Sequence, residues 1–217
     1  MTEVPLVRNI LKANDRIAAE NRKFFEDKGI LALNIMSGPG SGKTTLIENT
    51  IRSLKDELTI AVIEGDIQTT YDADRISTTG AQVVQINTDG SCHLDANMIN
   101  HTLGQLDLES VDVLIIENVG NLVCPASFDL GEHYKVMLLS TTEGDDKPLK
   151  YPLMFHISSA LIINKTDLIP YIDCDIQKIK DGALKINPNI EIFETSCKTG
   201  AGLEDWYGWL KSKVRVK

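Results

Sequence analysis

Seven short apolar runs alternate along this chain with helix-length segments of mixed polarity. The runs cover residues 31–36, 60–63, 83–86, 113–116, 136–139, 161–163 and 190–193. Strands that are apolar throughout and alternate with helices are typical of a mainly parallel sheet with helices on both faces. The sequence therefore predicts an α/β fold with a sheet of about seven strands. In such sheets, ligands bind beyond the carboxyl ends of the strands.

A separate helix is predicted ahead of the first run. Over residues 4–28, apolar side chains recur every three or four positions and charged side chains cover the other side, which is the pattern of an amphipathic helix. Gly29 ends it. We expect residues 1–29 to form a helix packed on a main domain of residues 30–217; an arm that docks a partner is the alternative.

The composition excludes several classes of protein. With 42% hydrophobic and 24% charged residues among 217, the chain has the make-up of a globular protein rather than a disordered one. Its 22 basic against 31 acidic residues argue against binding of nucleic acid, which needs clustered positive charge. The sequence shows no run of 18 apolar residues and no signal-peptide pattern. We therefore expect no membrane contact and a cytoplasmic protein with four free cysteines.

A phosphate-binding loop follows the first apolar run. Residues 37–45 read SGPGSGKTT, which matches the Walker A pattern from Gly42 onward, with Ser37 where glycine is usual. Glycines let backbone N–H groups surround a phosphate, and the helix N-terminus adds a favourable dipole. We expect Lys43 to reach the β- and γ-phosphates and Thr44 to ligate Mg²⁺. The expected nucleotide contacts of this loop are Gly40, Ser41, Gly42, Lys43, Thr44 and Thr45.

Two further motifs predict which base is bound. Residues 164–167 read Asn-Lys-Thr-Asp directly after the sixth apolar run, and the Asp carboxylate of such a motif can accept hydrogen bonds from guanine donors that adenine lacks. Residues 195–199 follow the last run, where GTPases place a backbone N–H near guanine O6. This order of motifs predicts GTP rather than ATP. The expected base contacts are Asn164, Lys165, Asp167, Ser196, Cys197 and Lys198.

Carboxylates end two other apolar runs. Glu117 ends the fourth run, and Gly120 follows three residues later. We expect Glu117 to hold Mg²⁺ through a water molecule and the N–H of Gly120 to sense the γ-phosphate. Asp66 follows the second run and is a candidate for the outer shell of the same ion. The alternative for Glu117 is a simple charge at the end of a strand.

Cysteine and histidine gather near the same ends of the strands. Cys92 and His93 lie between the third run and the next helical segment, and Cys124 lies four residues after Gly120. Thiolate and imidazole together suit Zn²⁺ or Ni²⁺ rather than Mg²⁺. Three ligands do not close a tetrahedral site, but two chains would supply enough. Spacing alone leaves two interpretations open, a metal site and an ordinary buried thiol at Cys92.

Taken together, these residues resemble the hydrogenase nickel-incorporation GTPases, the HypB family. The resemblance covers nearly the whole chain. Its most specific parts are Cys-His-Leu-Asp-Ala at residues 92–96 and Glu-Asn-Val-Gly-Asn-Leu-Val-Cys-Pro at residues 117–125. It also includes the phosphate loop, Gly65-Asp66, and the two guanine motifs. The resemblance raises the metal site above the alternative of a buried thiol.

This resemblance implies a function and a set of roles. It implies slow GTP hydrolysis, GTP-promoted dimerisation and delivery of nickel to the large subunit of [NiFe] hydrogenase, together with an accessory maturation protein. It also implies that Cys92, His93 and Cys124 bind Ni²⁺ or Zn²⁺ at the dimer interface, and that Asp72 helps to place the attacking water. The residues expected to take part in hydrolysis are Lys43, Asp66, Asp72 and Glu117.

Other functions remain as alternatives. A urease-type nickel GTPase is disfavoured, because that family has Cys-Pro-His where this chain has Cys-Pro-Ala at residues 124–126. A regulatory GTPase without metal cargo would not need Cys92 and His93. An interaction module with a vestigial phosphate loop is disfavoured by the intact loop. The leading hypothesis is that the γ-phosphate orders the segment at Gly120 and thereby moves Cys124.

Overall fold

The computed structural model describes residues 5–214, with side chains from residue 11 onward. Position 4, where the sequence predicts the first helix to begin, lies outside the described residues. The predicted α/β fold is confirmed: seven strands form one sheet in the order β3-β2-β4-β1-β5-β6-β7, and every neighbouring pair is parallel. The strands are β1 (Leu31–Ser37), β2 (Ile60–Asp66), β3 (Gln82–Asn87), β4 (Val113–Glu117), β5 (Tyr134–Ser140), β6 (Ala160–Asn164) and β7 (Glu191–Glu194).

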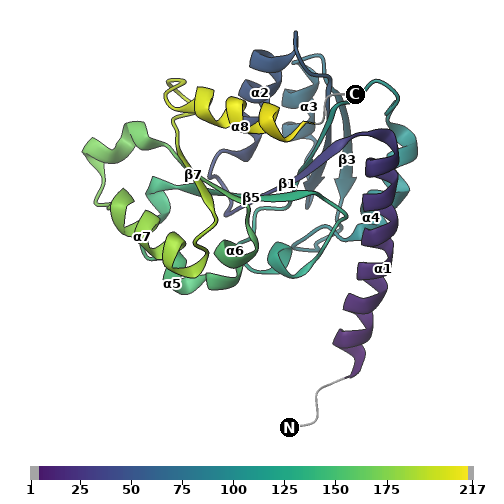
Figure 1. Ribbon diagram of the computed structural model, residues 1–217, viewed down its shortest axis with the longest axis horizontal. Helices are drawn as coiled ribbons and strands as arrows, with labels where there is room; N and C mark the ends of the chain where they lie inside the picture. Colours follow the sequence, from purple (N-terminus) through teal and green to yellow (C-terminus); the bar gives the residue numbers. More distant parts are fainter. Residues whose placement is uncertain (1–4, 215–217) are drawn as a thin grey trace.

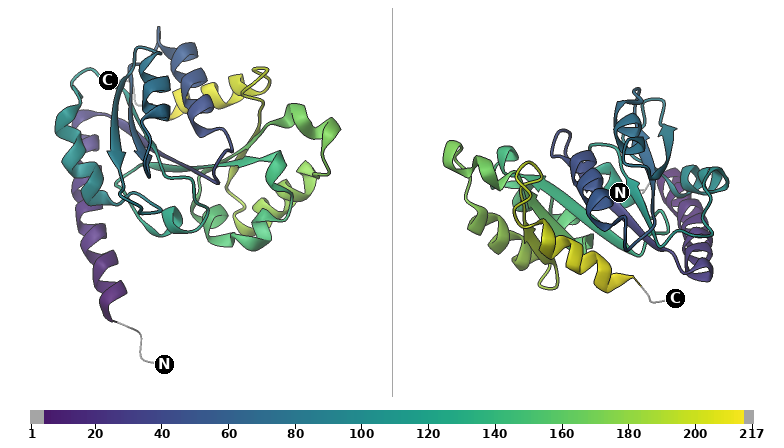
Figure 2. Two further views of the ribbon diagram at one scale, coloured as in Figure 1. Left: turned by 180° about the vertical axis from the view of Figure 1, so that it is seen from behind. Right: turned by 90° about the horizontal axis from the view of Figure 1, so that it is seen from above.

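Helices cover both faces of this sheet (Figures 1 and 2). The α-helices are α1 (Pro5–Lys28), α2 (Lys43–Leu54), α3 (Tyr71–Ser77), α4 (Ala96–Thr102), α5 (Lys147–Lys150), α6 (Pro152–Ile157), α7 (Ile176–Ile186) and α8 (Leu203–Lys213). Four short 3-10 helices span Leu103–Gln105, Cys124–Ser127, Thr141–Glu143 and Thr166–Tyr171. Apolar side chains of α2, α3 and α8 form one core with the sheet, and those of α1, α4, α6 and α7 form two cores on the opposite face.

The strand order explains where a ligand can bind. β1 lies at the centre of the sheet between β4 and β5. The loops that follow β1 and its neighbours run to opposite sides of the sheet, and a crevice for a ligand forms at such a point. All residues of β1, β4 and β6 are buried, whereas the edge strands β3 and β7 are partly exposed. The loops after the central strands therefore share one rigid, buried base.

Helix α1 lies along α4 at one side of the sheet, and its first half extends beyond the sheet (Figure 1). Ala18 and Phe25 are fully buried on its inner face, as the amphipathic pattern requires. Trp206 and Trp209 of α8 stack on each other and are buried on the other side of the sheet. None of the helices within residues 5–214 is both long and apolar enough to cross a lipid bilayer.

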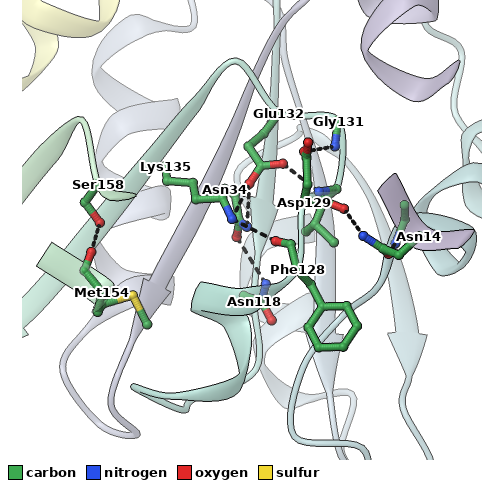
Figure 3. Close-up of polar contacts among 12 residues, drawn as sticks. Asn14, Asn34, Asn118, Phe128, Asp129, Gly131, Glu132, Lys135, Met154 and Ser158 are labelled. Carbon is green, nitrogen blue, oxygen red and sulfur yellow. Dashed lines mark hydrogen bonds and ion pairs between the residues drawn. The ribbon is translucent and has the colours of Figure 1, made fainter. Parts of the chain in front are cut away.

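A buried polar network links the core to the loop before β5 (Figure 3). Asn118, just after β4, donates from Nδ2 to Asn34 Oδ1 on β1 at 3.2 Å. Asn34 Nδ2 in turn donates to Glu132 Oε1 at 3.1 Å, and the backbone N–H of Leu130 donates to Glu132 Oε2 at 2.7 Å. Lys135 lies 3.4 Å from the same carboxylate. Satisfied networks of this kind fix one arrangement of the segments that they join.

We expect the apoprotein to lose stability with rising pH because of Glu132. Burial raises the pKa of Glu132, and the charge of Asp129 adds to this effect, while Lys135 and Asn34 oppose it. The folded state therefore holds a proton that the unfolded chain releases. This contribution is complete below the ordinary pKa of 4.5 and is lost as the pH rises through the higher folded value.

The test is a thermal denaturation series between about pH 5 and pH 8. The melting temperature of the wild type should fall further over this range than that of Glu132→Gln, whose amide cannot ionise. Parallel curves for the two proteins would show that Glu132 titrates alike in the folded and unfolded states.

Candidate functional site

The phosphate loop connects β1 to α2 and needs glycine at its last position. Gly42 caps α2 with a left-handed backbone (φ 105°), and a Cβ there would lie 2.6 Å from Asn164 Nδ2. Both the conformation and the space therefore exclude larger residues. Gly40 is also left-handed (φ 72°). The loop thus curls around the N-terminus of a twelve-residue helix, which is the arrangement that binds phosphate.

Lys43 and Thr44 open this helix and point toward buried acidic groups. Lys43 is 8% exposed, and its Nζ donates to Ser37 Oγ at 3.1 Å. The hydroxyl of Thr44 donates to Glu117 Oε1 at 2.8 Å. The structure therefore brings the ammonium group, the hydroxyl and the carboxylate of the predicted phosphate and Mg²⁺ residues to the ends of β1 and β4.

A cavity beside the phosphate loop is lined by Lys43, Gly120 and four carboxylates, those of Glu64, Asp66, Asp72 and Glu117. One oxygen each of Glu64, Asp66 and Asp72 lies within 4.8 Å of the others. Glu64 Oε2 and Glu117 Oε2 are buried without a hydrogen-bond partner. Burial raises the pKa of Glu64 to about 8, with the charges of the neighbouring carboxylates adding to it. Burial likewise raises the pKa of Glu117 to about 7, although the charge of Lys43 and the hydrogen bond from Thr44 act to lower it.

These orphaned oxygens test whether a cation fits. A buried carboxylate oxygen without a partner is unfavourable, and oxygen ligands are those that Mg²⁺ prefers. The residues therefore suit Mg²⁺: Asp66 lines the cavity, and the Thr44 hydroxyl lies 2.8 Å from Glu117 Oε1. The pKa of Asp66 is lowered despite burial, because Gln68 and Thr69 donate hydrogen bonds to its carboxylate. Asp66 therefore stays ionised more readily than Glu64 and Glu117, whose pKa values are raised.

The loops predicted to bind guanine lie beside the phosphate loop. Asn164, at the end of β6, donates from Nδ2 to the Ser41 carbonyl at 2.9 Å and accepts from the Cys197 N–H at 3.0 Å. Lys165 has a left-handed backbone (φ 63°), and its Nζ donates to the Gly40 carbonyl at 2.7 Å. Asn164 therefore joins three loops, from the ends of β1, β6 and β7, into one unit.

The remaining predicted base contacts surround this junction. Asp167 Oδ1 accepts from the Ser196 hydroxyl at 2.6 Å. Lys198 is exposed on the same loop. Burial raises the pKa of Cys197 to about 11, so its thiol stays protonated and is a poor metal ligand. Asp72 is not part of this junction. It lies on α3 near Glu64 and Asp66, and it forms an ion pair with Arg75 at 3.3 Å.

The segment after β4 contacts the phosphate loop directly. A Cβ on Gly120 would lie 3.0 Å from Pro39 Cα, so a larger residue would push the phosphate loop by a few tenths of an ångström. Beyond it, the Asn121 side chain accepts hydrogen bonds from the N–H groups of Val123 and Cys124, at 2.7 and 3.3 Å. Cys124 then begins a short 3-10 helix. A compact turn therefore connects Gly120, which contacts the phosphate loop, to Cys124 four residues later.

Cys92, His93 and Cys124 form a cluster at the end of this turn. One ligand atom from each lies within 4.8 Å of the others, and all three residues are half-buried. Cys92 Sγ is 3.8 Å from His93 Nδ1. A hydrogen bond with Cys92 raises the pKa of Cys124, and burial adds to this effect. Burial lowers the pKa of His93, against Asp95, which favours the neutral imidazole that binds metals. Two sulfurs and an imidazole suit Ni²⁺ or Zn²⁺, with one position left open.

Two acidic residues were missing from the predicted site. Glu143 braces the phosphate loop: its Oε1 lies 2.7 Å from Ser41 Oγ, and its Oε2 would be 2.6 Å from a Cβ on Gly38. The Ser-x-x-Glu pattern at residues 140–143, a capping box after the fifth strand, could have indicated it. Glu64 lies on β2, two residues before Asp66, and its burial beside Glu117 is visible only in the fold.

Comparison with known proteins places this geometry in a family. Residues 31–194 match the family model described as the CobW/HypB/UreG nucleotide-binding domain. The hydrogenase maturation factor HypB of Rhizobium leguminosarum bv. viciae is 52% identical over 208 residues, which cover 96% of this chain and 70% of that protein. The chain belongs to the HypB family of hydrogenase maturation factors. The resemblance inferred from the motifs is thereby confirmed.

Two further matches are to HypB from Helicobacter pylori. The crystal structure of HypB from this bacterium in complex with nickel superposes with a TM-score of 0.89, at 44% identity, and covers 94% of this chain and 95% of that one. A protein named hydrogenase/urease maturation factor HypB is 44% identical over 217 residues, covering 98% of this chain and 89% of its own length. This chain thus combines the nucleotide-binding domain of its family with the Cys/His cluster described above.

Proposed function

We propose that this HypB protein is a GTP-hydrolysing metallochaperone that carries nickel to the large subunit of [NiFe] hydrogenase. Nickel is the cargo of the Cys92, His93 and Cys124 cluster, and GTP is the substrate of the loop that begins helix α2. The nickel-bound crystal structure of a relative that is 44% identical supports the choice of cargo. Residues 30–217 act as the GTP-binding domain, with the N-terminal helix packed on it.

The phosphate end of the site supports hydrolysis. Lys43 supplies a positive charge where the β- and γ-phosphates lie in such loops, and backbone N–H groups of residues 40–45 surround them. Mg²⁺, when bound, neutralises charge that develops on the phosphates. Glu117 orients the Thr44 hydroxyl through their 2.8 Å hydrogen bond. Asp72, which lines the same cavity, is proposed to orient the attacking water.

One observation supports coupling between nucleotide and cargo: the turn from Gly120 to Cys124. A Cβ added to Gly120 would lie 3.0 Å from Pro39 Cα, so Gly120 packs closely against the phosphate loop, and Asn121 holds the backbone of Val123 and Cys124. A shift of Gly120 in response to the γ-phosphate therefore displaces one of the two thiols. Loss of that thiol from the site weakens the hold on the metal and favours its transfer.

The partners and the location follow from the same chemistry. Three ligands leave the metal site open, so a second copy of the chain, joined in a GTP-promoted homodimer, completes it. An accessory maturation protein and the hydrogenase large subunit are the proposed donor and acceptor of nickel. Thiolate ligands need a reducing compartment, and we propose the cytoplasm.

The coupling is tested by measuring the Ni²⁺ affinity of the full chain with GDP and with a non-hydrolysable GTP analogue. We expect the two affinities to differ by about 5- to 150-fold, the range of typical coupling free energies of 1–3 kcal/mol. Ni²⁺ must then change the affinity for the analogue by the same factor. Measuring the molecular size of the protein in the same samples shows whether the GTP analogue promotes the dimer. Equal Ni²⁺ affinity in the two nucleotide states would refute the coupling.

A further inference from the structure

The imidazole of the metal cluster is held from behind by an aromatic ring. The rings of His93 and Phe128 stack with centroids 3.8 Å apart and an angle of 25° between their planes. A stacked ring restricts rotation of the imidazole, and groups behind a ligand commonly set its orientation. Phe128 follows the short 3-10 helix that Cys124 begins, so the same connection carries one ligand and the support of another.

The backbone around Phe128 is fixed by side chains from other elements. Three successive carbonyls accept hydrogen bonds: Phe128 O from Lys135 Nζ at 2.8 Å, Asp129 O from Asn14 Nδ2 at 2.8 Å, and Leu130 O from Asn21 Nδ2 at 3.0 Å. Figure 3 shows the first two of these contacts, with the phenyl ring of Phe128 extending from the same loop. Two of the three donors belong to helix α1.

The same two asparagines also bind the segment that carries the ligands. Asn14 Oδ1 accepts from the Ala96 N–H at 2.9 Å, and Asn21 Nδ2 donates to the Ala96 carbonyl at 2.9 Å. Ala96 begins α4, three residues after His93. Asn14 is 7% exposed and Asn21 is fully buried. Each amide therefore bridges the His93 segment and the Phe128 loop, although neither touches the metal cluster.

We propose that Asn14 and Asn21 are positioning residues for the metal site, acting through the Phe128 stack. They hold the start of α4 and the loop after Cys124 at a set separation, so that Phe128 faces His93. The inference rests on the proposed role of this cluster in carrying nickel. It assigns to helix α1 a direct influence on metal affinity, in addition to its part in the hydrophobic core.

The experiment measures the Ni²⁺ dissociation constant of the full chain by competition with a chelator. Sulfur-to-nickel charge-transfer absorption reports the coordination. For Asn14→Ala, Asn21→Ala and Phe128→Leu we expect binding weaker by tenfold or more, as found for groups that orient metal ligands, together with an altered absorption band. Phe128→Tyr keeps the aromatic ring and should bind Ni²⁺ with wild-type affinity. GTP affinity of Phe128→Leu should stay within about twofold of wild type.

Asn187, the C-cap residue of helix α7, provides the matched control. Its Nδ2 donates to the carbonyls of Phe155, His156 and Ser158, at 3.2, 3.3 and 2.9 Å, so Asn187→Ala removes a comparable set of bonds from another helix end. It should lower the melting temperature but leave Ni²⁺ binding unchanged. The inference is wrong if Phe128→Leu and the asparagine variants bind Ni²⁺ as the wild type does, or no worse than Asn187→Ala. Failure of the wild type itself to bind Ni²⁺ would instead refute the proposed function.

Discussion

Replacing Lys43 with alanine is expected to lower GTP turnover by at least about a hundredfold, the typical loss when one stabilising group is removed from an active site. The Lys43 ammonium group lies 3.1 Å from Ser37 Oγ at the end of β1, inside the loop that is proposed to surround the phosphates. Its charge offsets the negative charge of the β- and γ-phosphates, and the alanine side chain provides none. Turnover is measured as phosphate release at saturating GTP with Mg²⁺ present.

Lys55→Ala is the matched control for this experiment. Lys55 is exposed just beyond the end of the same helix, α2, so its loss removes an equal charge without touching the loop. This control should hydrolyse GTP at the wild-type rate. Turnover by Lys43→Ala that equals the control would mean that the loop is not the phosphate site.

Replacing Cys92 with alanine is expected to weaken Ni²⁺ binding by at least about a hundredfold, because losing a ligand exceeds the effect of losing a group that merely orients one. Cys92 Sγ lies 3.8 Å from His93 Nδ1, and its ligand atom lies within 4.8 Å of that of Cys124. Alanine leaves only two ligands on the chain. The measurement is a Ni²⁺ titration against a competing chelator, with GTP affinity measured in parallel without Ni²⁺ and expected to be unchanged.

Cys174→Ala controls for the general affinity of thiols for Ni²⁺. Cys174 is also a half-buried free cysteine, and burial and neighbouring carboxylates raise the pKa of its thiol. It lies outside the cluster of Cys92, His93 and Cys124. Equal loss of Ni²⁺ binding in the two variants would show that binding is nonspecific, and no loss in either would remove the cluster from the proposed function.

Much of the fold could be predicted because its signals are local. An apolar run followed by glycine and a helix-length segment identifies strand, loop and helix without any knowledge of distant residues. The edge strands β3 and β7 were also predicted from their apolar runs, although both are partly exposed along their lengths. Their place at the two ends of the sheet is decided by pairing with β2 and β6, which the sequence pattern does not record.

The amino-acid sequence by itself determined the α/β architecture, the phosphate loop and the membership in the HypB family, because each depends on short contiguous patterns. Only the tertiary structure decided which distant groups meet. Glu143 lies 2.7 Å from Ser41 across 102 positions, and Asn14 reaches Asp129 across 115. Asparagine and glutamate are common on exposed surfaces, so their sequence positions carry no sign of such contacts. Hydrogen bonds over these separations form only once the parallel sheet has brought the loops together at one end.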